Sequence, residues 1–241
     1  MNIKTIVKKS EYDFLKNNPH LNHNIILLGF GGSYSYGTNV ESSDIDIRGI
    51  ATNSKREILL GSDFEQVQDK NTDSVIFSLK KSINLLINCN PNILEMLFLK
   101  PEHYAYISEA GQMLIENRNL FLSQKCFYSY GGYAKQLFFR KSKKLNKEMM
   151  HLVRLYKNAI EILSTGSFCT YCEKDHDLLM AIRNGEYTYD GKASPKLISI
   201  IHDLEIDMKQ ALKHTALPLK PDTEKIYDLV CKINEEIVVT H

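Results

Sequence analysis

The sequence predicts an α+β protein in which a small mixed β-sheet with helices is followed by an all-α region. An apolar, β-branched run over residues 25–30 is short enough to be a buried strand. Residues 45–51 alternate between apolar and polar, as a half-buried strand does. From about Tyr104 onward strand patterns fade and helical periodicity replaces them. We therefore expect two domains, residues 1–120 and residues 121–241.

The remaining elements are predicted from local patterns. An amphipathic segment over residues 8–17 ends before Pro19, which favours a helix there. Asn90 and Pro91 begin another helix, because the missing N–H of proline costs least at the first helical position. Glu95 within this helix is interpreted as a solvated or capping acid. We further expect a short strand over 64–68 and helices over 79–87, 196–213 and 223–236, the last two completing a helical bundle.

Composition excludes some classes of protein. With 30 basic and 29 acidic residues among 241, the net charge of +1 favours no class of partner. The N-terminus lacks a signal-peptide pattern and no window is long enough for a membrane span, so we expect a cytoplasmic protein without a membrane partner. Five scattered cysteines argue against a disulfide framework. Cys169, Cys172 and His176 could be half of a zinc site, but without a second ligand pair we favour ordinary thiols. The oligomeric state stays open.

The residues that follow the first predicted strand carry the strongest chemical pattern. Gly32 and Ser33 would lie in a tight turn, where small residues let backbone N–H groups approach a phosphate and the serine adds a hydroxyl donor. Asp44 and Asp46 would lie on the next strand and point to the same face. Because two adjacent carboxylates repel, a hard cation such as Mg²⁺ is the expected occupant. An acidic hairpin tip is the alternative for a lone Asp-x-Asp, but the nearby Gly–Ser turn favours the metal site.

The fuller pattern of residues 32–49, Gly-Ser-x-x-Tyr-Gly-Thr-x-x-x-Ser-x-Asp-Ile-Asp-Ile-Arg-Gly when written with variable positions, resembles the DNA polymerase β-like nucleotidyltransferase superfamily. It is most similar to a bacterial and phage branch that includes an RNA-repair-associated group, and the resemblance extends over about residues 20–190. It implies a nucleotidyltransferase core that transfers a nucleoside monophosphate from a nucleoside triphosphate (NTP), such as ATP, to an acceptor hydroxyl. It also implies two Mg²⁺ ions, with Mn²⁺ as a possible substitute.

The same resemblance assigns roles to individual residues. Gly32 and Ser33 would bind the triphosphate, and Arg48 would neutralise developing charge. The superfamily needs a third carboxylate on a neighbouring strand, for which we select Asp73. Asp63, Glu65 and Asp69 are alternatives within a few positions. Asp73 could instead cap the helix that follows.

A basic segment lies in the predicted helical region. It could follow a nucleic-acid backbone or surround a triphosphate, or it could be a solvated helix face. The resemblance makes His151 and Arg154 candidate phosphate or base contacts, and Arg183 a further phosphate contact; surface or capping roles are the alternatives. The seven basic residues of the segment are Lys135, Arg140, Lys141, Lys143, Lys144, Lys147 and Arg154.

Three functions therefore compete. The first is a nucleotidyltransferase acting on an RNA or DNA end, which the basic segment and the RNA-repair association favour. The second has the same chemistry but a protein or small-molecule acceptor. The third is a non-catalytic module that binds nucleotide or nucleic acid, against which the presence of both the Gly–Ser turn and the two aspartates argues.

Overall fold

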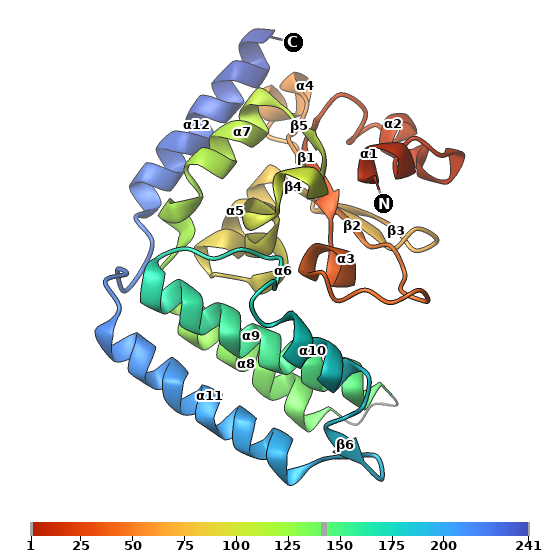
Figure 1. The fold of residues 1–241 in the computed structure, drawn as a ribbon. Helices are drawn as coiled ribbons and strands as arrows, with labels where there is room; N and C mark the ends of the chain where they lie inside the picture. Colours follow the sequence, from red (N-terminus) through yellow and green to blue (C-terminus); the bar gives the residue numbers. More distant parts are fainter. Residues whose placement is uncertain (1, 141–143, 241) are drawn as a thin grey trace.

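A computed structural model describes residues 2–140 and 144–240 and shows a five-stranded mixed sheet flanked by helices (Figure 1). The strand order is β3-β4-β2-β1-β5. Strands β2 and β4 run parallel, whereas the other neighbours run antiparallel. The predicted α+β class is confirmed. The strands are β1 (Ile25–Phe30), β2 (Ile47–Ala51), β3 (Gln66–Asp69), β4 (Ser74–Ser78) and β5 (Tyr104–Ile107).

Both faces of the sheet are covered by apolar side chains. Consecutive residues of β1 point to opposite faces, so Leu27 joins the larger buried cluster and Leu28 the smaller one. The smaller cluster packs under α1 (Ile3–Ile6) and α2 (Phe14–Asn17). The helix predicted over residues 8–17 is found only in part, because a 3-10 turn at Ser10–Tyr12 precedes α2.

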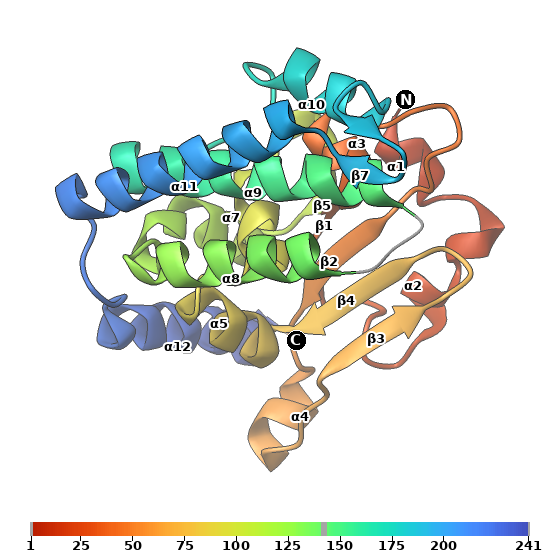
Figure 2. The same cartoon turned by 90° about the horizontal axis from the view of Figure 1, so that it is seen from below.

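Helix α9 (Leu145–Thr165) is the centre of a helical layer below the sheet. It packs against α8 (Lys125–Phe139), α10 (His176–Arg183) and α11 (Pro195–His214). Most of its residues are buried because neighbouring helices cover it on several sides. Both views show α8, α9 and α11 side by side (Figure 2). Helix α11 agrees with the helix predicted over residues 196–213.

The sequence led us to expect that the helix over residues 223–236 would complete this layer. Helix α12 (Thr223–Thr240) does not do so. It returns to the sheet-bearing part and packs against α4 (Lys55–Leu60) and α7 (Glu109–Glu116). Its buried residues Ile226 and Ile233 belong to the same cluster as residues of the sheet and of α9. One apolar core therefore crosses residue 120, and the domain boundary there stays a prediction.

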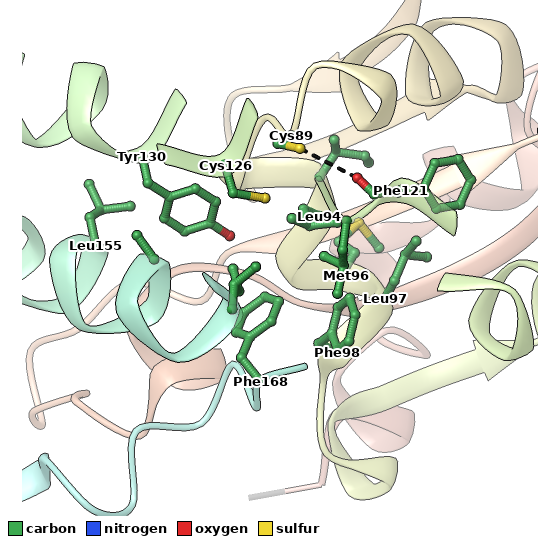
Figure 3. Packing of buried hydrophobic residues seen from close by; sticks show 14 of the residues in the cluster. Cys89, Leu94, Met96, Leu97, Phe98, Phe121, Cys126, Tyr130, Leu155 and Phe168 are labelled. Atoms are coloured by element: carbon green, nitrogen blue, oxygen red, sulfur yellow. Dashed lines mark hydrogen bonds between the residues drawn. The ribbon is translucent and has the colours of Figure 1, made fainter. Parts of the chain in front are cut away.

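The centre of this core joins the sheet-bearing part to the helical layer (Figure 3). Cys89 donates a hydrogen bond to the carbonyl of Phe121 at 3.4 Å, and Tyr130 and Phe168 pack nearby from the helical side. All five cysteines are free thiols. In the described part of the chain, no helix is long and apolar enough to cross a membrane. The shorter elements are α3 (Gly32–Tyr36), α5 (Leu79–Ile87), α6 (Pro91–Leu94), β6 (Thr188–Tyr189), β7 (Lys192–Ala193) and the 3-10 turns Glu95–Phe98, Pro101–His103 and Arg118–Phe121.

Candidate active site

The glycines after β1 lie in direct contact with Asp46. The N–H of Gly31 donates to the carbonyl of Asp46 at 2.8 Å, and Gly32 begins the short helix α3. Gly32 has φ +55°, and a Cβ placed on it would lie 1.8 Å from Oδ2 of Asp46. Glycine is therefore required here both by the backbone conformation and by the space available. The predicted meeting of the glycine turn with an acid is found at Asp46.

Asp46 and Asp73 are brought together by the parallel pairing of their strands. Ile47 of β2 pairs with Ser74 of β4, so the two aspartates immediately precede neighbouring parallel strands at one edge of the sheet. A guanidinium N–H group of Arg48 lies 3.3 Å from Oδ1 of each aspartate. Asp73 has φ +44°, a left-handed conformation that aspartate tolerates better than most residues. Arg48 therefore holds a pair of carboxylates.

The structure separates Asp73 from the other candidates for a third carboxylate. Asp73 does not cap the following helix, since β4 intervenes and Ser78 is the N-cap of α5. Asp63 pairs with Lys80 and Glu65 with Lys81, whereas Asp69 accepts a hydrogen bond from Thr72. Of the four candidates, Asp73 is the one that shares Arg48 with Asp46.

The side chain of Asp46 is 18% exposed. Its burial, together with the nearby carboxylate of Asp73, raises the pKa of Asp46 to about 6, although Arg48 acts in the opposite direction. One guanidinium therefore does not compensate the two carboxylates fully, and an additional cation would be bound favourably.

The aspartate pair fits a metal ion that arrives with a nucleotide. Among the described residues, no group of three or more Asp, Glu, His or Cys side chains could hold an ion by itself. Mg²⁺ is commonly bound by one or two carboxylates together with substrate phosphates. Asp46 and Asp73 satisfy that smaller requirement.

Asp44 lies elsewhere, and the prediction that it shares a strand and a face with Asp46 is wrong. Strand β2 begins only at Ile47, which pairs with Phe30 of β1 and with Ser74 of β4. The preceding residues form a turn in which Ser43 accepts a hydrogen bond from the N–H of Val40. Asp44 is exposed and lines a second cavity of about 560 Å³.

The main cavity, about 370 Å³, lies between the glycine turn and helices α8 and α9. Gly32, Asp46 and Arg48 line it from the sheet side, whereas Arg140 and Lys147 line it from the helical side. Ser35 also lines it, two positions after the predicted Ser33. Ser33 is itself buried and is not among the lining residues. The cavity combines several cations with one carboxylate of the aspartate pair, which suits an anionic ligand bound with a metal ion.

His151 and Arg154 both line this cavity from α9. Burial, and then the positive charges of Arg154 and Lys147, lower the pKa of His151 to about 3, so its imidazole is neutral at physiological pH. Arg154 is 4% exposed and donates to Glu95 at 2.5 Å, with its guanidinium 3.6 Å from the centroid of the Tyr36 ring. Much of its charge is therefore balanced inside the protein, and its contact with a nucleotide stays a prediction.

Several lining residues were missed or misjudged from the sequence. Glu95, interpreted from the sequence as a solvated or capping acid, is 4% exposed and therefore not solvated. Helix α6 ends after one turn, and the 3-10 turn that follows places Glu95 against α9. Tyr133 of α8 also lines the cavity and accepts a hydrogen bond from Asn90 at 2.8 Å. The sequence signal that could have identified Tyr133 as a lining residue is its position close to the basic residues of the segment.

The described residues of the basic segment line different cavities. Arg140 and Lys147 line the main cavity, whereas Lys135 lines smaller hollows between α8, α9 and α11. Lys141 and Lys143 lie outside the described residues. A continuous basic track along this segment therefore stays a prediction.

Comparison with known proteins gives two matches. Residues 6–183 match the RNA repair pathway DNA polymerase beta family. A 124-residue alignment with the uncharacterized 38.9 kDa protein in the nrdC-mobD intergenic region of enterobacteria phage T4 shows 28% identity. It covers 46% of this chain and 37% of the phage protein, so the chain matches less than half of that relative's length. Because the family match spans most of the chain and includes the glycine turn, the aspartate pair and the helices that close the cavity, the chain belongs to the RNA repair pathway DNA polymerase beta family, a polymerase β-like nucleotidyltransferase family.

Proposed function

We propose that the protein transfers a nucleoside monophosphate from an NTP to the terminal hydroxyl of an RNA or DNA strand. The hydroxyl oxygen forms a bond to the α-phosphorus, and the bond from that phosphorus to the bridging oxygen of the β-phosphate breaks. Pyrophosphate leaves with the electron pair of the broken bond. The hydroxyl proton passes through the Asp73 carboxylate to water.

One observation carries this proposal: Gly32, Asp46, Asp73 and Arg48 converge at one edge of the sheet beside a cavity that cations line from the opposite side. The cavity volume of about 370 Å³ is within the range of small-molecule sites. A triphosphate has the charge that such a cavity favours. Gly32 lines the cavity without a side chain and so allows close approach of the triphosphate oxygens.

The residues have separate roles in the proposal. Asp46 and Asp73 would hold Mg²⁺ with the triphosphate, and Asp44 would be a ligand of a second ion, with Mn²⁺ as a possible substitute. The metal supplies charge stabilisation for the entering and leaving oxygens. Arg48 and Lys147 would bind phosphate oxygens, with the backbone of Gly32 as a further donor. Ser33, the predicted hydroxyl donor, is buried and does not line the cavity. His151, being neutral, would act as a hydrogen-bonding group toward the nucleotide and not as a charge partner.

An RNA or DNA acceptor is favoured by the family's association with an RNA repair pathway and by the cationic helical side of the cavity. The decisive experiment incubates the purified chain with Mg²⁺, each α-labelled NTP in turn, and RNA or DNA oligonucleotides. We expect label on the oligonucleotide and its loss when a chelator is added. Label found only on protein or on a small molecule would mean that the acceptor is not a nucleic acid. No label on any acceptor would contradict the proposed transferase function.

Variants of the aspartates test the site itself. Asp46→Asn and Asp73→Asn should each reduce the rate by about a thousandfold or more, because each removes a carboxylate that acts on the reacting phosphates. Glu65→Gln is the matched control, since this exposed acid pairs with Lys81 and does not line the cavity. Equal loss in Glu65→Gln would show that the assay reports folding and not the site.

A further inference from the structure

The second cavity adjoins the main one. It has a volume of about 560 Å³, and Lys147 lines both cavities. Asp46 lines the main cavity and Asp44 the second one. The two acids of the Asp-x-Asp pattern therefore lie on either side of a shared wall. This arrangement suits a reaction with two substrates that meet at the boundary.

Arg183 is the distinctive residue of the second cavity. It is the last residue of α10, and one guanidinium nitrogen donates to the hydroxyl of Ser43 at 2.9 Å. The other terminal nitrogen is buried and has no hydrogen-bond partner in the described part of the chain. Burial lowers the pKa of Arg183, and no carboxylate among the described residues counters this effect. A partly buried guanidinium that lacks a counter-charge is stabilised when an anion binds beside it.

The residues around Arg183 are held in place by hydrogen bonds between separate elements. Asn146, at the start of α9, accepts a hydrogen bond from Thr188 at 2.8 Å, which fixes the β6–β7 hairpin beside the cavity. The positive charge of Arg183 also contributes to the lowered pKa of His151 in the main cavity, so the two cavities lie close enough for this charge to act on both.

From this geometry we propose that the second cavity binds the phosphodiester backbone of the acceptor strand, with Arg183 and Lys147 contacting its phosphates and its terminal hydroxyl at the shared wall, facing the Asp46–Asp73 pair. This inference rests on the proposed nucleotidyl transfer and assigns a binding site to its acceptor strand. The main cavity then holds the NTP, and transfer occurs at the wall that Lys147 shares. Phosphate contacts position the strand without reading its sequence.

The test measures binding of fluorescein-labelled single-stranded RNA, and of DNA of the same sequence, by anisotropy over a range of salt concentrations. Arg183→Gln should weaken RNA binding by about tenfold and reduce the slope of log affinity against log salt by about 0.7, the value for one phosphate of a single strand. Arg183→Lys should restore part of the affinity because it keeps the charge. The affinity for NTP should fall far less than the affinity for RNA, because Arg183 does not line the main cavity. An equal loss with DNA would show that the phosphates are bound, whereas a loss confined to RNA would add a contact with the ribose hydroxyl.

Two further variants keep the test interpretable. Lys147→Gln alters an exposed side chain and should weaken binding of both RNA and NTP, because Lys147 lines both cavities. Lys209→Gln, on α11 and lining another hollow, should change neither. Thermal melting of each variant identifies any loss of folding, and Lys147→Gln carries the test if Arg183→Gln does not fold.

The outcomes separate this inference from the proposed function. If the wild type labels RNA but Arg183→Gln has an unchanged KM for RNA and an unchanged salt slope, the subsite is wrong while the function stands. If RNA binds through Arg183 but receives no label, the function is wrong while the subsite stands. Label transferred only to a protein or a small molecule would overturn the subsite as an acceptor site.

Discussion

Gly32 has no space for a side chain, and its backbone also disfavours one. It has φ +55°, and an added Cβ would overlap the Asp46 carboxylate. Gly61 offers a direct comparison, since it has φ +67° but no heavy atom within 4 Å of an added Cβ. Replacing the two glycines in turn therefore separates backbone strain from displacement of the aspartate.

We expect Gly32→Ala to reduce transferase activity by about a hundredfold or more, because even a displacement of about 1 Å at a reacting group has an effect of that size. Gly61→Ala should lower the free energy of unfolding by about 1–2 kcal/mol without changing kcat. Steady-state kinetics and urea denaturation measure both effects. Equal activity losses in the two variants would show that strain, and not the position of Asp46, is responsible.

His151 gives a pH prediction whose sign follows from its lowered pKa. Between pH 6.5 and about 3 the unfolded chain binds a proton at this residue that the folded chain does not. The free energy of unfolding should therefore decrease as the pH falls through this window, by up to about 1.4 kcal/mol per pH unit from this group. His151→Asn should show a shallower decrease in urea denaturation.

The exposed His23→Asn variant is the control for this measurement. An equally shallow profile in His23→Asn would show that the effect is not specific to His151. A His151→Asn profile parallel to the wild-type profile would mean that the imidazole is not kept neutral by its surroundings.

Single residues were predictable from the sequence where the signal was local. The spacing between the glycines and Asp46 indicated their meeting, and the short segment before β4 limited the third carboxylate to four candidates. Strand pairing of β2 starts at Ile47 because β1 ends and β4 begins opposite this residue, so the position of Asp44 could not be inferred from alternation. The burial of Glu95 depends on Arg154, 59 residues later in the chain.

At the scale of elements, the Glu95–Arg154 pair joins the 3-10 turn after α6 to the central helix α9. Both side chains are nearly inaccessible, and Thr170 also donates to the carbonyl of Glu95 at 2.7 Å. A buried ion pair contributes little net stability compared with apolar residues, but removing one partner leaves an uncompensated charge. The pair therefore fixes α9, and with it Lys147 and His151, relative to the sheet.

Glu95→Gln should lower the free energy of unfolding by about 3–5 kcal/mol, because the Arg154 guanidinium then lacks its counter-charge. Replacing both residues by leucine should be less destabilising than Glu95→Gln alone. Urea denaturation of the single and double variants measures the coupling between them. Glu65→Gln, which breaks an exposed pair with Lys81, should change stability little. If the losses of stability from replacing Glu95 and Arg154 singly add up to the loss from replacing both, the two residues do not act as a pair.

The elements that the sequence predicted best are those with local periodicity. Strand β1 and helices α5, α11 and α12 follow from apolar spacing alone. The division of the segment around Ser10–Tyr12 and the short length of α6 did not, because packing against the sheet decides where these turns end. The site depends on such turns, so its outline was predictable but its second cavity was not.

At the scale of the molecule, α12 packs the end of the described chain against the sheet-bearing part. It leaves the helical layer after α11 and packs beside α4 and α7 (Figures 1 and 2). Its residues Ile226 and Ile233 are fully buried in the cluster that also contains Leu86 and Met150. Because that cluster crosses the boundary predicted near residue 120, the two parts should unfold together.

We expect Ile233→Ala to lower the free energy of unfolding by about 2–5 kcal/mol, since it leaves a cavity in the shared core. Val239→Ala, at an 82% exposed position of the same helix, should have little effect. Far-UV circular dichroism and tyrosine fluorescence during urea denaturation should report one transition that moves to lower urea as a whole. If two transitions are seen and Ile233→Ala moves only one of them, the halves before and after residue 120 unfold independently. Both cavities are lined by residues of both halves, so their walls could then separate while each half stays folded.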